Sequence, residues 1–273
     1  ADTFELAAAP GGASIETTGA QAGTHTLISE PNLGYSLETD GYWLDRGPTN
    51  RWAMFDQKNG TRTEQAEVIT LTLQPTARIE ALALLAMDAT HVDVVMRDSE
   101  GAVIYERSTD LVDLSQITGY YEWFFTDRVR RDKLFLGDLP NNYAPTIEIT
   151  IEYPGGVAAV GSLVLGRLEQ LGWTEFGYSL AIDDFSQKDR DEFGNYLVVE
   201  RSYADIIEVP LEIERSKMSQ KHRLMAKYRA VPLVWQASET DDASIVFGYF
   251  REWRVDVSYP TTCKSTIEIE GLN

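Results

Sequence analysis

The chain has 273 residues, a formal net charge of −19 at pH 7 and one cysteine, Cys263. A field this negative repels the phosphates of nucleic acids and anionic lipids, and a single cysteine excludes both an intrachain disulfide framework and a thiolate metal cluster. No segment approaches the roughly 18 consecutive apolar residues that cross a bilayer, so we expect neither a nucleic-acid partner nor membrane insertion.

The first part of the chain predicts little regular structure. Residues 1–24 are rich in Ala, Gly and Thr, and they lack the basic segment followed by an apolar run that marks a signal peptide. We therefore expect an extended arm over residues 1–24. In an assembly, such an arm could lie across a neighbouring subunit.

From about residue 25 to residue 168 the pattern predicts β-strands. Apolar and polar side chains alternate over residues 67–75, and a hairpin is predicted over residues 91–106 with its turn at residues 98–101. Residues 78–87 have the composition of a short helix, but the flanking strands and the nearby Pro75 favour a buried strand. Strand patterns recur at the short spacing that is typical of a β-sandwich.

The composition changes near residue 170, where a second and smaller unit is predicted. Strand patterns follow one another, and one helix is predicted from Lys217 to about Arg229, with Ser216 as its N-cap. Its apolar residues fall mostly on one stripe, and Pro232 follows its end. We expect an α+β domain with one helix on a sheet.

No motif in the chain indicates catalysis. The three histidines, His25, His91 and His222, are far apart and have no metal-ligand spacing. Ser179 lies in GYSLA, which lacks the closing glycine of a nucleophile elbow, and no phosphate-binding loop is present. We expect no enzyme, no cofactor and no metal. A glycan hydrolase is a third alternative, which no motif supports.

The acidic segment DRDEFGNYLVVE has the spacing of a calcium loop at several positions. Phe193 stands where that loop needs an oxygen ligand, so an EF-hand is excluded. An acidic hairpin with Gly194 and Asn195 in its turn is the preferred interpretation. A looser cation site stays open as an alternative, formed by Asp183, Asp184, Asp189 and Asp191.

Residues 215–229 reverse the charge of the chain, because they contain six bases and no acid. One interpretation is a solvated helix face. The other is a surface that docks on an acidic partner, including a second copy of this protein. The candidate docking residues are Lys217, Lys221, Arg223, Lys227 and Arg229.

Residues 43–56, WLDRGPTNRWAMFD, combine aromatic and charged side chains around a Gly-Pro-Thr-Asn loop. Aromatic faces stack on sugars while Asp, Asn and Arg bind the hydroxyls, so the segment suits a carbohydrate site. It also suits a sandwich corner, with Trp52 and Phe55 pointing inward, and we favour the corner. The candidate carbohydrate-binding residues are Trp43, Asp45, Arg51 and Trp52.

Two segments of the chain resemble known families. Residues 41–168 resemble galactose-binding-like, carbohydrate-binding-module jelly rolls through RWAMFD before EVITLTL, the hairpin VDVVMRDSEGAVIY and the closing strand VGSLVLGRL. Residues 170–273 are similar to a module of tail proteins from tailed bacteriophages. The motifs there are GYSLAIDDFSQKDRDEFGN, VVERSYAD, KYRAVPLVWQAS, VFGYFREWRVDVSYP and STIEIEGL.

These resemblances imply a mainly β fold: the arm of residues 1–24, a jelly-roll β-sandwich over residues 25–169, and an α+β tail-assembly domain over residues 170–273. They imply a structural component of a phage virion, at the tail tip or baseplate and assembled in the host cytoplasm. Its partners would be other phage tail proteins and copies of itself. The alternative is a carbohydrate-binding module that recognises a host surface glycan.

Overall fold

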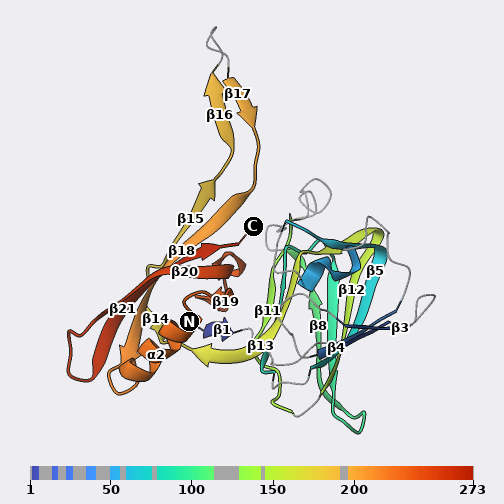
Figure 1. The fold of residues 1–273 in the computed structure, drawn as a ribbon, viewed down its shortest axis with the longest axis horizontal. Helices are drawn as coiled ribbons and strands as arrows, with labels where there is room; N and C mark the ends of the chain where they lie inside the picture. The colour runs from blue at the N-terminus through green and yellow to red at the C-terminus, as the bar shows by residue number, and fades with distance from the viewer. Residues whose placement is uncertain are drawn as a thin grey trace, which may run out of the picture. The chain divides into compact units, whose positions relative to one another are not determined.

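The structure is a computed structural model, which describes residues 2–5, 14–17, 23–26, 35–40, 50–55, 60–75, 79–113, 129–142, 145–190 and 196–272. The chain forms two compact units (Figure 1). Unit 1 contains Ala1–Glu5 and Leu168–Asn273, and unit 2 contains Leu6–Arg167. The domain boundaries predicted from the sequence, including the arm, stay a prediction.

Unit 2 contains an antiparallel five-stranded sheet and a group of three further strands. The sheet has the order β4 (Tyr35–Asp40), β5 (Thr63–Pro75), β12 (Thr146–Val160), β7 (His91–Arg97), β8 (Val103–Asp110). The further strands have the order β11 (Leu134–Leu136), β6 (Ala81–Leu85), β13 (Ser162–Gln170). The short pairs are β2 (Ser14–Thr17) with β3 (Gly23–Thr26), and β9 (Val112–Asp113) with β10 (Val129–Arg130).

The strands of unit 2 pack as a sandwich because their apolar faces meet. Ile69, Leu71 and Leu73 alternate along β5 with half-buried or exposed neighbours, and all three are fully buried. They share one core cluster with Leu82 and Leu84 of β6. All five residues of β6 are buried, which confirms the strand predicted there. A segment buried on both faces needs no polar alternation, which explains its helix-like composition.

The predicted hairpin over residues 91–106 is confirmed as β7 and β8. Asp98 Oδ1 accepts hydrogen bonds of 2.9 Å from the N–H groups of Glu100 and Ala102. Gly101 has a φ of 85°, in the left-handed region that glycine adopts without a steric penalty. The aspartate and the glycine together form the tight turn that fixes the strand register.

Unit 1 is one antiparallel sheet with a helix on it. The strand order is β1 (Asp2–Glu5), β19 (Leu233–Gln236), β20 (Ile245–Asp256), β21 (Thr262–Gly271), β18 (Tyr203–Glu214), β14 (Trp173–Thr174). Strand β15 (Ser179–Asp184) also pairs with β18, and β16 (Gln187–Arg190) pairs with β17 (Tyr196–Val199). The helix is α2 (Met218–Tyr228), and a short 3-10 turn, η2 (Asp242–Ser244), precedes β20.

Helix α2 packs on the sheet through Met225 and Tyr228, which share the unit 1 core with residues of β18, β19, β20 and β21. The predicted N-cap, Ser216, is wrong. Lys217 is the N-cap residue and makes no side-chain cap, while the Ser216 hydroxyl lies 3.4 Å from Glu214 Oε2. The chain enters the helix through a backbone turn, in which Lys217 N–H donates to the Glu214 carbonyl at 3.0 Å. In the same turn the Met218 N–H donates to the Arg215 carbonyl at 3.3 Å, so an N–H group that a Ser216 cap would satisfy is already bound.

The predicted fold class is confirmed: the chain is mainly β, with a jelly-roll β-sandwich and a smaller α+β part. Within the described residues, no helix combines the length and the apolar character needed to cross a membrane.

Candidate interaction site

Unit 1 contains a largely exposed hairpin, formed by β15 and β16 with β17 and the start of β18 (Figure 1). Strand β15 pairs with β18 from Ser179 opposite Glu208 to Asp184 opposite Tyr203. Strand β21 pairs with β18 only as far as Ile206. Among the described strands, the sheet therefore continues beyond Ile206 as two strands alone.

The hairpin extends the core face of the unit 1 sheet into solvent. Leu180 lies opposite Ile207 in the register, and residues opposite each other share a face of the sheet. Ile207 is 1% exposed and belongs to the core, whereas Leu180 is 48% exposed. On the same face, farther along the hairpin, Ile182 is 69% and Tyr203 is 54% exposed. The face thus continues where the helix no longer covers it, now with Asp205 opposite Ile182 and Asp184 opposite Tyr203.

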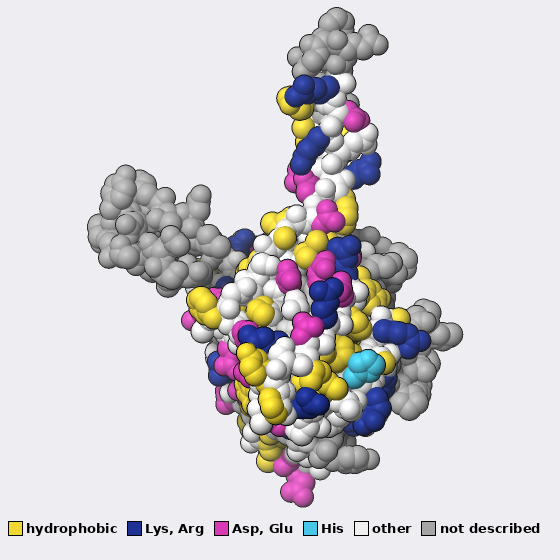
Figure 2. All heavy atoms as spheres, turned by 90° about the vertical axis from the view of Figure 1, so that its left-hand side faces the viewer, with side chains coloured by type: hydrophobic (Ala, Val, Ile, Leu, Met, Phe, Trp, Pro, Cys, Tyr) yellow, Lys and Arg dark blue, Asp and Glu magenta, His cyan; other side chains and the backbone are white. Residues whose placement is uncertain are grey.

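More apolar side chains lie exposed toward the hairpin tip and at its base. All residues of β15 and β16 are exposed. Figure 2 shows hydrophobic side chains between charged ones along this hairpin. An isolated two-stranded hairpin is marginally stable in water, and an exposed apolar patch marks an interaction surface. The exposed apolar residues, beyond the three above, are Phe176, Phe185, Tyr196, Val198 and Val199.

The charged groups of the hairpin mostly bind one another. Lys188 Nζ lies 2.6 Å from Asp184 Oδ2, and Ser186 N–H donates to Asp184 Oδ1 at 2.9 Å. These hydrogen bonds, that of Lys188 first, lower the pKa of Asp184 below its usual value. Gln187 Nε2 donates to Asp189 Oδ2 at 2.5 Å. The described residues hold no group of three or more His, Cys, Asp or Glu placed for a metal ion, and Asp191 lies outside them.

The predicted docking residues lie on α2 or next to its ends, and several bind within unit 1. Lys221 is only 12% exposed; its Nζ lies 4.0 Å from Glu169 Oε2 and donates to the Gln170 carbonyl. Lys217 Nζ lies 3.1 Å from Glu214 Oε2. Lys227 Nζ lies 4.3 Å from the centre of the Tyr228 ring, and Arg229 donates to the Ala226 carbonyl at 2.9 Å. Arg223 is exposed on the helix.

The outer face of the unit 1 sheet carries a row of carboxylates across three strands. Glu208 of β18 lies opposite Glu268 of β21, which lies opposite Glu252 of β20. With Arg254 and Thr266, they line an open hollow of about 200 Å³. Arg254 lies 2.8 Å from Glu252 and Arg251 lies 3.2 Å from Glu268. The sequence alone does not reveal this row, because it depends on the register of three strands.

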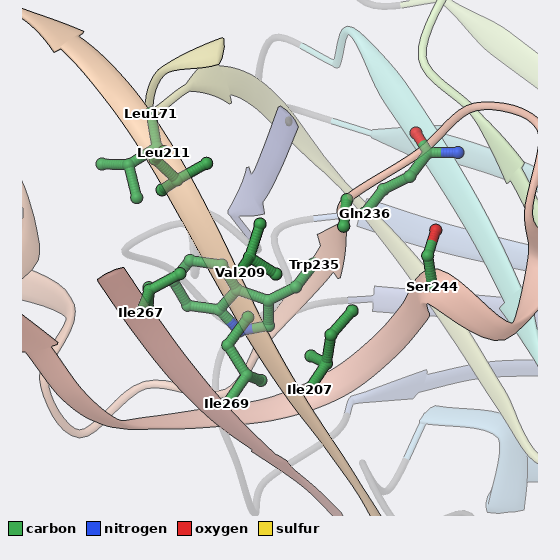
Figure 3. Close-up of a pocket in the computed structure, with 10 residues that line it drawn as sticks. Leu171, Ile207, Val209, Leu211, Trp235, Gln236, Ser244, Ile267 and Ile269 are labelled. Carbon is green, nitrogen blue, oxygen red and sulfur yellow. The ribbon is translucent and has the colours of Figure 1, made fainter. Parts of the chain in front are cut away.

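An apolar cavity lies inside unit 1 (Figure 3), next to Trp235 of β19. In Figure 3 the indole lies among the side chains of Val209, Ile267 and Ile269. The cavity has a volume of about 10 Å³. That volume is the least that holds one water molecule, and the lining is apolar except for Gln236 and Ser244. We assign it to the core packing of unit 1 and not to a ligand.

Unit 2 brings His91, Ser108 and Asp110 together on neighbouring strands. Ser108 Oγ lies 2.9 Å from His91 Nε2, and Asp110 Oδ1 lies 2.7 Å from His91 Nδ1, as in a Ser-His-Asp triad. However, Asp93 Oδ1 lies 3.1 Å from the same Nε2. Hydrogen bonds to Asp110 and then Asp93 raise the pKa of His91 above 6.5. A carboxylate lies on each ring nitrogen, Asp110 on Nδ1 and Asp93 on Nε2, so the geometry favours an ion pair over an activated Ser108 nucleophile.

The sequence does not predict this group, because each histidine stands far from the others along the chain. His91 and Asp93 are two residues apart, as are Ser108 and Asp110, but the second pair lies beyond residue 106, where the predicted hairpin ended, on the longer observed strand β8. Only the register could join them, by placing His91 opposite Asp110 and Asp93 opposite Ser108.

The carbohydrate-binding prediction falls mainly outside the described residues. Trp43 and Asp45 lie outside them, and for Arg51 and Trp52, in the 3-10 helix η1 (Asn50–Phe55), no side chain is described. Phe55 is 8% exposed, which confirms that it points inward. The neighbouring Met54 is fully buried, and its N–H donates to Thr63 Oγ1 at 3.0 Å. The end of this segment is therefore fixed to the unit 2 core.

No protein-family model matches the chain, and no curated protein matches it. Solved structures similar to it include an F5/8 type C domain from Bacteroides fragilis, the lectin binding domain of Lectinolysin complexed with Lewis b, and CpGH89CBM32-6 produced by Clostridium perfringens. They are 8%, 11% and 8% identical to this chain, with TM-scores of 0.35, 0.33 and 0.32. The matches cover 50%, 49% and 49% of this chain and 93%, 90% and 94% of theirs. Likeness at this level carries no argument about function.

Proposed function

We propose that this chain is a structural subunit of a larger protein assembly, which it joins through protein–protein contacts of unit 1. The observation that carries the proposal is the hairpin: Leu180, Ile182 and Tyr203 continue a core face into solvent on two unsupported strands. A partner that packs on this face would bury the apolar side chains that the chain itself leaves exposed. The proposed role includes no catalysis.

The energy available at the hairpin is sufficient for such a contact. Burying one large aliphatic or aromatic side chain contributes roughly 1.5–3 kcal/mol. Several of the exposed apolar residues covered together would therefore offset a large part of the cost of association, which is on the order of 4–15 kcal/mol.

We further propose that the assembly is the virion tail of a bacteriophage, at the tail tip or baseplate. The support is the resemblance of residues 170–273 to a tail-protein module, which includes the hairpin segment and α2. The partners would then be other tail proteins and copies of this chain, joined in the host cytoplasm.

Two measurements test the proposal. A hairpin variant, Ile182→Thr with Val198→Thr, should lose assembly while its melting temperature stays within a few degrees, because both side chains are exposed. Val103→Thr is the matched control, since Val103 is 48% exposed on a hairpin of unit 2. Antibody labelling of negatively stained phage particles should place the chain at one position on the tail. A hairpin variant that assembles normally, or particles without label, would count against the proposal.

Glycan binding by unit 2 is a second candidate, carried by the mixture of aromatic and polar side chains in residues 43–52. Trp43, Asp45, Arg51 and Trp52 would bind the sugar. Lewis b, the glycan in one of the similar structures, is a reasonable first probe. Trp52→Ala should abolish binding with the fold intact. If Trp52 instead fills a sandwich corner, the same change should cost about 3–5 kcal/mol of stability and no specific affinity.

A further inference from the structure

We propose that helix α2 of one copy docks on the outer face of the unit 1 sheet of a second copy, with Arg223 near Glu208, so that copies associate head to tail. This inference rests on the proposed assembly role and names one partner and one pair of surfaces within it.

The two surfaces lie on opposite sides of the same sheet. Helix α2 covers the core face, because its Met225 shares a cluster with Ile207 and Ile267. Side chains alternate along a strand, so Glu208, next to Ile207, and Glu268, next to Ile267, point to the other side. A contact between the front of one copy and the back of the next is heterologous, and it repeats until a ring closes or a filament grows.

The charges of the two surfaces are complementary. The segment 215–229 carries six bases and no acid, and of these Lys217 and Lys221 already lie beside carboxylates of unit 1. On the outer face, the strands β18, β20 and β21 place seven carboxylates against three cations, by their register and ion pairs. The carboxylates are Glu208, Glu212, Glu214, Glu252, Asp256, Glu268 and Glu270, and the cations are Arg251, Arg254 and Lys264.

Within the outer face, Glu208 is the carboxylate that would be stabilised most by a cation of a partner. Arg251 binds Glu268 and Arg254 binds Glu252. Among the described residues, no cation forms an ion pair with Glu208, although it lies directly opposite Glu268. Like charges at opposite positions destabilise a sheet, so a cation supplied from outside would relieve this repulsion.

On the helix, Arg223 is the matching group. It is exposed, and among the described residues it has no carboxylate partner. A guanidinium binds a carboxylate through two parallel hydrogen bonds, which fixes orientation as well as distance. Arg229, also exposed, follows at the helix end. A second copy is the occupant that we favour, because its outer face offers ordered carboxylates in excess of cations. The net charge of −19 opposes the approach of phosphate and of other faces of the chain.

The test uses two neutralising variants of the full chain. The helix variant is Arg223→Gln with Arg229→Gln, and the sheet variant is Glu208→Gln with Glu252→Gln. Each variant alone should self-associate on the order of tenfold more weakly than the wild type, measured by light scattering and sedimentation at about 50 mM salt. Arg62→Gln with Arg107→Gln is the control, because both are exposed bases of unit 2. It should associate like the wild type.

Mixing the two variants gives the decisive measurement. Each retains the surface that the other lacks, so a head-to-tail contact predicts that the mixture stops at 1:1 dimers. Self-association of either variant at wild-type strength, or a mixture that forms no dimer, overturns the inference. A wild-type chain that stays monomeric overturns it as well. The proposed function is tested separately by the hairpin variant and by the label on particles, so the two can fail independently.

Discussion

Glu208 lies directly opposite Glu268 on the outer face of the unit 1 sheet, in an antiparallel pair of strands. Repulsion between opposite like charges costs about 0.2–1 kcal/mol, so Glu208→Gln should raise the free energy of unfolding by that amount. Urea denaturation at low salt measures it, and about 1 M salt should remove the gain. An unchanged or lowered stability at low salt would show that the pair costs the fold nothing.

His91 should make stability depend on pH. Its hydrogen bonds to Asp110 and Asp93 raise its folded pKa above 6.5. A raised pKa contributes stability that is fully present below the unfolded value and is lost as the pH rises through the folded value. His91→Gln should therefore destabilise the chain more at pH 5.5 than at pH 9, as measured by urea denaturation at both.

Asp110→Asn is the companion variant for this prediction. It removes the largest cause of the shift, so the pKa of His91 should fall toward 6.5 in an NMR titration. A His91 pKa that does not move in this variant would rule out Asp110 as the main cause.

Ile207 lies in the covered part of one sheet face, and Ile182 lies in the uncovered part of the same face. Ile207 is 1% exposed, so Ile207→Ala should cost about 2–5 kcal/mol of stability. Ile182 is 69% exposed, so Ile182→Ala should change stability by less than about 0.5 kcal/mol while weakening assembly. Denaturation and light scattering on both variants check the contrast. A large stability loss in Ile182→Ala would mean that this side chain is already covered within one copy.

Gly248 is required by the close approach of β20 and β21. A Cβ added there would lie 1.9 Å from the Glu270 carbonyl oxygen, which is backbone and cannot rotate away. Gly248→Ala should therefore destabilise unit 1 by about 1–3 kcal/mol or more. Gly155→Ala in unit 2 serves as a comparison, because an added Cβ meets nothing within 4 Å and only the φ of 75° is strained. Equal losses in the two variants would contradict the role of the close approach.

The sequence by itself determined the elements whose signals are local. Alternation along β5, the aspartate and glycine of the β7–β8 turn, and the apolar stripe of α2 each depend on neighbours a few residues apart. Side-chain direction repeats every two residues in a strand and about every 3.6 in a helix, so such patterns predict the element and its buried face. The fold class followed from these elements, as did the inward position of Phe55.

The tertiary structure decided which distant residues meet and which apolar faces stay uncovered. The triad-like group around His91 and the carboxylate row of Glu208, Glu252 and Glu268 depend on strand register. The backbone turn before α2 displaced the predicted cap, Ser216. In the sequence, Ile182 and Ile207 are both isoleucines of strands. Ile207 is buried because α2 packs on its part of the sheet, whereas Ile182 is exposed because it lies beyond the end of β21 and beyond α2. Burial depends on what packs against a residue, and a strand pattern does not contain that information.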